Sequence, residues 1–386
     1  MQDAMQVPVP EREPVRVLQV LGSSAGGVAR HVRQLGEVLG AVGPGGPGWT
    51  VHVAGPAALA DDVAPPAGPV VFRPVEIADR PRPADLAAIR RLRALAAGAH
   101  VLHAHGLRAG ALAVLATRGL PGARRPRVVV TLHNLPVGGR AVRTVSAVLE
   151  RVVARGADKV LGVSGDLVDR ARALGARTAE RALVPAPSRP RTPADAAAVR
   201  EALGVPGTDH LLVTVARLAP QKGLDTLLDA ARRLVVPGVF SAPPRGLVWV
   251  VAGDGPLHDA LAARIGDERL PVRLLGRRSD VPDLLAAADV VVSTAVWEGQ
   301  PIAVQEALQL GAAVVATDAG GTREVTGDDG AVLVPVGDAA AVAGAVRALL
   351  DDRPRRDRLR AAAGRRAAEL PDVAAVVEQL RRVYDA

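Results

Sequence analysis

The sequence predicts an α/β protein made of two doubly wound, Rossmann-like domains, each a parallel sheet covered by helices on both faces. Three observations lead to this prediction. The chain has 386 residues, more than one hydrophobic core comfortably holds, so two domains are expected. Short apolar runs alternate with segments of helical periodicity along the chain, an order typical of parallel sheets. A proline-rich stretch, VPAPSRPRTPADA at residues 184–196, interrupts that order near the middle.

Apolar runs that indicate buried strands occur on both sides of the interruption. Before it they are residues 15–21, 50–55, 69–75, 100–105, 127–133 and 158–164. After it they are residues 210–218, 246–254, 271–276, 288–294, 312–318 and 331–337. An amphipathic helix begins after Pro371. We therefore expect an N-terminal domain at residues 1–188, a C-terminal domain at 189–370 and a final helix at 371–386.

Composition limits the function classes. The chain has no cysteine, which excludes disulfides and thiolate metal sites. Its N-terminal stretch has neither the basic start nor the long apolar run of a signal peptide, so a cytoplasmic protein is expected. The net charge is +8, but the arginines are scattered and no aromatic residue lies within an arginine cluster. We therefore expect no nucleic-acid partner, and we keep peripheral contact with an anionic membrane as the alternative.

Lysine is rare in this arginine-rich chain. Of 48 basic residues only Lys159 and Lys222 are lysines. A lysine that persists in such a composition marks a position where a compact ammonium group is needed, although chance survival explains it equally well. Lys222 is therefore a candidate functional residue.

The stretch from Trp297 to Gly321 places two carboxylates, Glu298 and Glu306, around an expected helix start. Pro301 suits the first helical turn and Gly311 suits the helix end. The free N–H groups of a helix N-terminus suit a phosphate, whereas carboxylates accept hydrogen bonds from sugar hydroxyls. Together these features indicate a nucleotide-sugar site. The alternative is a Glu that complements the helix dipole and a second, exposed helix Glu.

A second constellation lies in VTVARLAPQKGLDTLLDA, residues 213–230. A buried strand ends at Arg217, and a helix opens near Lys222. Cations at a strand end and a helix start suit an anionic leaving group. Ordinary surface charge is the alternative.

The motifs ARLAPQKG, AGDGPL, LGRRSDVPDLLAAADVVVST and EGQPIAVQEALQLGAAVVATDAGGTREVT resemble family 4 retaining glycosyltransferases of the GT-B fold. The resemblance implies two domains facing across a cleft, with the final helix returning to the first domain. It gives Arg217 and Lys222 the donor diphosphate, Glu298 the donor sugar and Glu306 the ribose. The other donor-binding positions it implies are Gly253, Arg277, Arg278, Gln300, Pro301 and Ile302, with the backbone at Arg277–Arg278 facing the base. Where the family often has Phe-Gly, this chain has Gln300–Pro301.

The first domain matches the family less closely. Gly26 and Gly27 in SSAGGVARHV resemble its N-terminal glycine loop, where the backbone can approach a phosphate or an acceptor. His133 ends a buried strand and, by resemblance, contacts the donor sugar or its phosphate. His103 and His105 share one face of a strand, which favours cleft lining or packing over a metal site. The acceptor is expected around Gly26, Gly27, His105, Arg108 and His133; the alternative is that these residues have purely structural roles.

The resemblance implies a retaining transferase of hexosyl or N-acetylhexosaminyl groups that uses a UDP- or GDP-sugar. Because no Asp-x-Asp pair lies near a strand end of the second half, we expect transfer without a metal ion or other cofactor. The acceptor would be a small molecule, a glycan or a lipid-linked sugar. A nucleotide-sugar epimerase and a non-catalytic nucleotide-sugar binder remain alternatives. A phosphorylase would need pyridoxal phosphate on a lysine, and a second suitable lysine is lacking.

Overall fold

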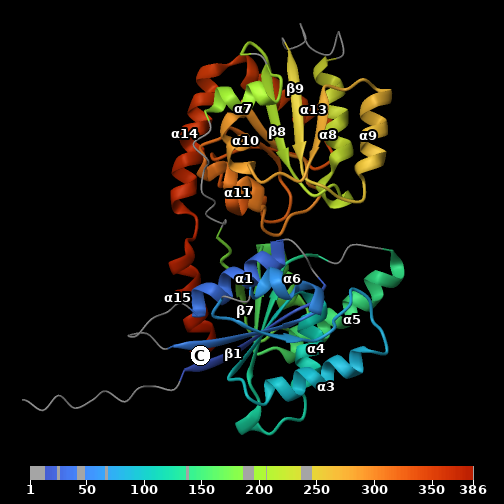
Figure 1. Ribbon diagram of the computed structural model, residues 1–386, viewed down its shortest axis with the longest axis vertical. Helices are drawn as coiled ribbons and strands as arrows, with labels where there is room; N and C mark the ends of the chain where they lie inside the picture. The colour runs from blue at the N-terminus through green and yellow to red at the C-terminus, as the bar shows by residue number, and fades with distance from the viewer. Residues whose placement is uncertain are drawn as a thin grey trace, which may run out of the picture. The chain divides into compact units, whose positions relative to one another are not determined.

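The computed structural model describes residues 14–23, 27–40, 48–65, 68–135, 139–185, 195–205, 207–235 and 246–385. The chain divides into two compact units (Figure 1). Unit 1 comprises Met1–Val163, Leu167–Leu183 and Val373–Ala386, and unit 2 comprises Ser164–Asp166 and Val184–Asp372. The expected boundary at residues 188–189 lies outside the described residues.

Unit 1 is built on a seven-stranded sheet in the order β3-β2-β1-β4-β5-β6-β7, in which every pair of neighbours is parallel. The strands are β1 (Val15–Leu21), β2 (Trp49–Gly55), β3 (Val71–Pro74), β4 (Val101–His105), β5 (Arg127–Leu132), β6 (Lys159–Gly162) and β7 (Ala179–Arg181). Strand β7 is absent from the sequence prediction because its three residues, AER, form no apolar run.

Helices cover both faces of this sheet, because each parallel pair needs a crossover connection. They are α1 (Gly27–Gly40), α2 (Ala60–Val63), α3 (Asp85–Ala96), α4 (Leu107–Thr117), α5 (Arg140–Gly156), α6 (Gly165–Ala173) and α15 (Val373–Asp385). Helix α4 packs between α3 and α5, while α1 packs on α2, β2 and α15. The final helix α15 thus belongs to unit 1.

Unit 2 is built on a six-stranded parallel sheet in the order β10-β9-β8-β11-β12-β13. Its strands are β8 (His210–Val215), β9 (Leu247–Ala252), β10 (Val272–Gly276), β11 (Val290–Ser293), β12 (Val314–Thr317) and β13 (Val332–Val334). Its helices are α7 (Ala196–Ala202), α8 (Leu224–Val235), α9 (His258–Asp267), α10 (Val281–Ala287), α11 (Ile302–Gln309), α12 (Thr322–Thr326), α13 (Ala339–Asp351) and α14 (Arg353–Glu369). Every strand predicted from the sequence is present, which confirms the two doubly wound domains.

Side-chain alternation along β8 divides the core of unit 2 into two layers. Leu212 packs in the cluster that includes residues of α8 and α13. Its neighbours Leu211 and Val213 pack in the cluster that includes residues of α10 and α11. All three side chains are fully buried, as expected for a parallel strand covered on both faces.

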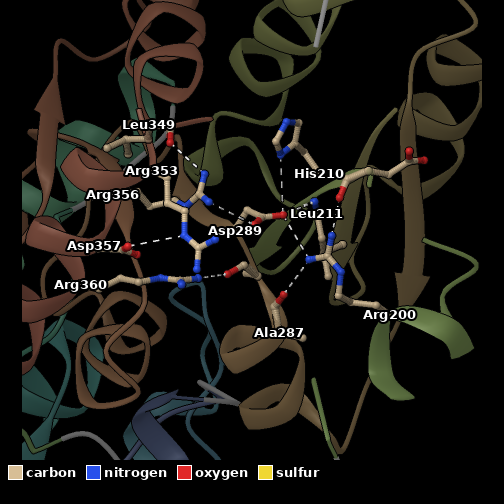
Figure 2. Close-up of polar contacts among 12 residues, drawn as sticks. Arg200, His210, Leu211, Ala287, Asp289, Leu349, Arg353, Arg356, Asp357 and Arg360 are labelled. Carbon is tan, nitrogen blue, oxygen red and sulfur yellow. Dashed lines mark hydrogen bonds and ion pairs between the residues drawn. The ribbon is translucent and has the colours of Figure 1, made fainter. Parts of the chain in front are cut away.

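An arginine-rich network braces the amino ends of β8 and β11 (Figure 2). Asp289, directly before β11, accepts hydrogen bonds from the Leu211 backbone N–H at 2.9 Å and from Arg200 at 3.1 Å. Arg356 of α14 lies 3.9 Å from the same carboxylate, and Arg360 donates to the Ala288 carbonyl at 2.7 Å. One carboxylate therefore ties α7 and α14 to the sheet.

Candidate functional site

The strand order of unit 2 reverses between β8 and β11. Ligands of doubly wound sheets bind outside the carboxyl ends of the strands at such a switch point. Here that edge carries two loops, residues 216–223 after β8 and residues 294–301 after β11. Arg217, Lys222 and Glu298, which the sequence singled out in this half, lie on these loops, and Glu306 lies in α11, which follows the second loop.

The structure brings Lys222 and Glu298 into direct contact, Nζ to Oε1, across 76 positions of sequence. Neighbouring bonds fix the two loops to each other. Thr294 Oγ1 donates to the Lys222 carbonyl at 3.1 Å, and Gln221 Nε2 donates to the Trp297 carbonyl at 2.9 Å. The contact is therefore held by two loops that are themselves joined.

The Lys222–Glu298 pair is partly accessible. The lysine side chain is 25% exposed and the glutamate side chain 11%, so a ligand at the strand ends can reach the ammonium while the carboxylate sits deeper. Arg217, on the same loop as Lys222, is exposed. The edge thus offers two cations for an anion and one oriented carboxylate for hydroxyl groups.

The glycine pair Gly320–Gly321 supports the Glu298 loop, a role that the sequence did not reveal. The Gly321 N–H donates to the Glu298 carbonyl at 2.7 Å. Gly320 has φ +53°, and a Cβ there would lie 2.2 Å from the same carbonyl oxygen. A Cβ at Gly321 would lie 2.1 Å from the Gly299 carbonyl oxygen. Only glycines allow the chain after β12 to approach the loop this closely.

Helix α11 starts one residue later than expected. Pro301 is its N-cap, with φ −78° and ψ 78°, and Ile302 is the first helical residue, so the prediction of proline in the first turn is wrong by one position. The Ile302 N–H donates to the Gln300 carbonyl at 2.9 Å. The first-turn N–H groups of Ala303 and Val304 have no i−4 carbonyl within the helix, so they are the N–H groups of α11 that a ligand could use.

Glu306 lies in the second turn of α11 and is 7% exposed. Its neighbour Gln305 is fully buried and donates to the Val184 carbonyl at 3.2 Å. Gln300 donates to the same carbonyl at 3.2 Å and to the Gln305 side chain at 3.1 Å. Gln300, expected to bind donor, thus has the packing function of anchoring the start of α11.

The remaining donor-side residues follow β9 and β10. Gly253 has φ +144°, and a Cβ there would lie 1.9 Å from the Ala216 carbonyl oxygen, so this glycine lets the chain after β9 pass against the loop after β8. Arg277 and Arg278 are both exposed. Arg278 makes two hydrogen bonds to Asp280, at 2.8 and 2.6 Å, which raise the pKa of Arg278 and lower that of Asp280. The Arg278 side chain is thereby held next to the β10 end.

In unit 1 the switch point lies between β1 and β4, and four histidines gather at that edge. His103 and His105 come from β4, His133 follows β5, and His31 comes from α1. His105 Nδ1 lies 3.3 Å from His133 Nε2, and the His31 ring centroid lies 5.8 and 5.6 Å from those of His105 and His133. His31 was not predicted from the sequence, although it lies four residues before the buried Leu35 on one helix face.

His103 is the structural member of this cluster. Its Nδ1 lies 2.7 Å from the Tyr384 hydroxyl of α15, and its Nε2 lies 2.7 Å from Thr131 Oγ1. Both ring nitrogens are thus used by the protein, which agrees with the expected packing role of His103. The bond to Tyr384 also attaches α15 to the sheet.

Burial keeps the whole cluster neutral at physiological pH. It lowers the pKa of His31 to about 4 and, together with the nearby His31, that of His103 to about 3. Burial and the neighbouring rings lower the pKa values of His105 and His133 well below 6.5. In the part of the chain that the structure describes, no group of three or more His, Asp or Glu side chains has the arrangement of a metal site.

The other residues of unit 1 that were expected near the acceptor are Gly26, Gly27 and Arg108. Gly26 lies outside the described residues. Gly27 is the first residue of α1, and a Cβ there would meet open space. Arg108 binds Asp85 at 2.9 and 3.0 Å and the Ala78 carbonyl at 3.2 Å, so its guanidinium braces the segment before α3.

Two family models match the chain. Residues 26–187 match the model described as glycosyl transferase 4-like domain, and residues 209–352 match that described as glycosyl transferases group 1. The two matches correspond to the two doubly wound units and together span most of the chain. The second range contains the four motifs that resemble the family.

Curated relatives match parts of the chain over 31% to 51% of their own length. The lipopolysaccharide core biosynthesis mannosyltransferase LpsB of Rhizobium meliloti is 30% identical over 42% of this chain and 48% of its own length. The phosphatidyl-myo-inositol mannosyltransferase of Mycobacterium leprae is 36% identical over 43% of each chain. The chain thus matches about half the length of these relatives.

Solved structures match nearly the whole fold. Anabaena HepE in complex with UDP-glucose superimposes with a TM-score of 0.75, at 20% identity, over 96% of this chain and 99% of that one. Sucrose-phosphate synthase from Thermosynechococcus elongatus gives the same TM-score and identity over 97% and 98%. With the two family models, this fold shows that the chain belongs to the family 4 glycosyltransferases of the GT-B fold.

Proposed function

We propose that the protein is a retaining glycosyltransferase that moves a hexosyl or N-acetylhexosaminyl group from a UDP- or GDP-sugar to an acceptor hydroxyl. The observation that carries the proposal is the Lys222–Glu298 contact at the switch point of unit 2. It joins a cation suited to a diphosphate and a carboxylate suited to sugar hydroxyls within one rigid pair of loops. The relatives named as mannosyltransferases support the same reaction class.

The donor diphosphate would lie against Lys222, Arg217 and the first-turn N–H groups of α11. The bond between the anomeric carbon and the diphosphate oxygen breaks, and that carbon gains positive charge. Fixed cations and N–H groups at the departing oxygen stabilise this charge separation, and each such donor typically contributes about 3–4 kcal/mol. Because these groups supply positive charge themselves, we infer that transfer needs no metal ion.

Glu298 would hold the donor sugar and Glu306 the ribose. For retention, the acceptor oxygen bonds to the anomeric carbon on the face from which the diphosphate leaves. The acceptor proton passes to the departing diphosphate oxygen, so no side chain needs to act as base. Lys222, held in place by Glu298, would stabilise the oxygen that receives the proton.

We assign the acceptor to the edge of unit 1 that carries His105 and His133. Their imidazoles stay neutral, and the contact between His105 Nδ1 and His133 Nε2 leaves one ring nitrogen of each histidine, so the pair keeps one donor and one acceptor. That capacity matches hydroxyl groups, which also donate and accept. A neutral His133 would likewise hold a sugar hydroxyl without attracting the diphosphate away from Lys222.

The alternative of membrane contact has a structural basis in α5. Val142, Val145 and Val148 are 43%, 40% and 56% exposed, at a spacing of three residues. Exposed arginines accompany them on the helix: Arg140, Arg143, Arg151 and Arg155. An apolar face with basic flanks suits the interface of an anionic bilayer. Among the described residues, no helix has the length and hydrophobicity to cross a bilayer, so the contact we infer is peripheral.

Lipid contact would fit a lipid-linked acceptor, the kind of substrate named for the phosphatidyl-myo-inositol mannosyltransferase relative. Helix α5 carries a single acidic residue, Glu150, which is buried and accepts two hydrogen bonds from Arg170, at 2.6 and 2.8 Å. The solvent face of α5 therefore keeps a net positive charge. We infer that this face, from Val142 to Val148, approaches anionic lipid.

The test of the proposed reaction is product analysis with UDP-glucose and GDP-mannose as donors and octyl glucoside and octyl mannoside as acceptors. We expect release of UDP or GDP together with an α-linked product, identified in NMR by the one-bond coupling between the anomeric carbon and its proton. A changed donor sugar without acceptor would instead indicate an epimerase. Donor binding without any product would indicate a sensor, and a β-linked product would contradict retention.

A further inference from the structure

Unit 1 has a pocket of about 260 Å³ on the face of β1–β3 near the amino ends of the strands. The histidine cluster lies at the carboxyl ends, so the pocket is separate from the acceptor edge. Strands β1 to β3 form its floor, and α3 with the chain after it forms its wall. The polar side chains that line it are Arg16, Thr50, His52, Arg73 and Arg91.

The strand register explains why these side chains meet. Arg16 of β1 pairs with Thr50 of β2, and Arg73 of β3 pairs with Ala54, which lies on the same face of β2 as Thr50 and His52. A parallel strand covered by helices on both faces is normally apolar throughout. Strand β2, WTVHVAG, instead alternates, with Thr50 and His52 turned to the pocket and Val51 and Val53 buried.

Positive charge in the pocket is not balanced by carboxylates. Among the residues that the structure describes, no Asp or Glu lines it. Neither Arg73 nor Arg91 forms an ion pair with any residue that the structure describes. Arg16 is fixed by hydrogen bonds to the Gly98 carbonyl at 2.6 Å and to His100 Nε2 at 3.1 Å. Three guanidinium groups therefore share one pocket, and none of the described residues that line it supplies a counter-ion.

The positive charge in the pocket also affects the pKa of His52. Partial burial and then the positive charge of Arg73 lower its pKa below 6.5. No carboxylate raises the pKa of His52 in return. A neutral His52 beside Thr50 supplies hydrogen bonds between the arginines, which is the donor set that phosphate oxygens need.

We propose that this pocket is a second anion site, which binds a small metabolite carrying one or two phosphate groups. Planar guanidinium groups bind phosphate through paired hydrogen bonds. The apolar part of the lining, which includes Leu18 and Leu95, accommodates the carbon part of such a metabolite. The site is independent of the donor diphosphate, because its residues all belong to unit 1 whereas Lys222 belongs to unit 2.

Isothermal titration calorimetry with glucose 6-phosphate tests the proposal, with glucose as the neutral comparison and a buffer of physiological salt. We expect binding of glucose 6-phosphate only, and at least a tenfold loss of affinity in the double variant Arg73→Ala/Arg91→Ala. Arg90→Ala is the matched control, since Arg90 is the exposed neighbour of Arg91 on α3 and does not line the pocket. The Lys222→Ala variant should bind glucose 6-phosphate as the wild type does.

A direct readout comes from the ring protons of His52 in NMR, assigned with His52→Gln. Glucose 6-phosphate should shift them, whereas glucose should not. Unchanged affinity in the double variant, loss of binding in Lys222→Ala, or the absence of binding by the wild type would each overturn the proposal. So would an equal loss in Arg90→Ala, because that would indicate diffuse surface charge.

Discussion

The two lysines of the chain allow a matched test of the donor site at the scale of single residues. Lys222 contacts Glu298, and Lys159 contacts Glu180 at 2.7 Å. Both are partly exposed members of lysine–glutamate pairs, but only Lys222 lies at the strand ends of unit 2. Composition marked both lysines and the motif ARLAPQKG singled out Lys222, whereas its contact with Glu298 joins loops 76 positions apart and required the structure.

We expect Lys222→Ala to lower kcat/KM for transfer by roughly 10²–10³, because it removes one fixed cation from the departing oxygen. Lys159→Ala should leave kcat/KM within about twofold of the wild type. Steady-state kinetics of nucleotide release measures both values, and thermal unfolding confirms that the variants fold. Wild-type turnover in folded Lys222→Ala would refute the diphosphate assignment.

Gly320 supports the same site through its backbone. Gly320→Ala places a Cβ in a left-handed conformation and 2.2 Å from the Glu298 carbonyl oxygen, so the Glu298 loop must move. We expect the free energy of unfolding to fall by about 2 kcal/mol and donor nucleotide affinity to fall at least tenfold. Gly344→Ala in α13 is the control. A Cβ there meets open space, and the exchange should raise helix stability by up to about 1 kcal/mol. Equal effects of both exchanges in urea unfolding would contradict the account.

At the scale of elements, the strands of both sheets were predictable because they are continuous apolar runs. The exceptions have physical reasons. Strand β7, AER, lies at the sheet edge and needs no buried run. Helix α11 starts after Pro301, and Gln300 and Gln305 beside this start bind the Val184 carbonyl, a contact between segments over 100 positions apart that no local pattern contains.

Helix α5 carries a prediction of its own. If its valine face approaches anionic lipid, Val145→Ser/Val148→Ser should lower binding to vesicles that contain phosphatidylglycerol about tenfold, because less apolar surface leaves water. Val336→Ser is the control, since Val336 is 41% exposed and lies in unit 2. Cosedimentation with vesicles measures the binding. Equal binding by the double variant and the wild type would exclude this face as the membrane-binding surface. Equal binding to vesicles with and without phosphatidylglycerol would exclude it as well.

At the scale of the whole molecule, the histidine cluster links stability to pH. The folded-state pKa values of His31 and His103, about 4 and about 3, lie below the ordinary 6.5. Below pH 6.5 the unfolded chain therefore binds protons that the folded chain does not. The stabilisation is fully present above pH 6.5 and is lost as the pH falls toward 4.

We expect the free energy of unfolding to fall across this range by up to about 1.4 kcal/mol per pH unit for each such histidine. Urea unfolding between pH 7 and pH 5 measures the slope. His31→Asn should reduce the slope, whereas His258→Asn, which changes a half-exposed histidine of unit 2, should not. A slope unaffected by His31→Asn would show that the cluster does not control this dependence.

The most direct test of the central claim is a crystal structure of the protein with UDP or GDP, grown in the presence of EDTA. We predict a diphosphate in contact with Arg217, Lys222 and the first turn of α11. A nucleotide bound elsewhere, or one that binds only when magnesium replaces EDTA, would contradict the account.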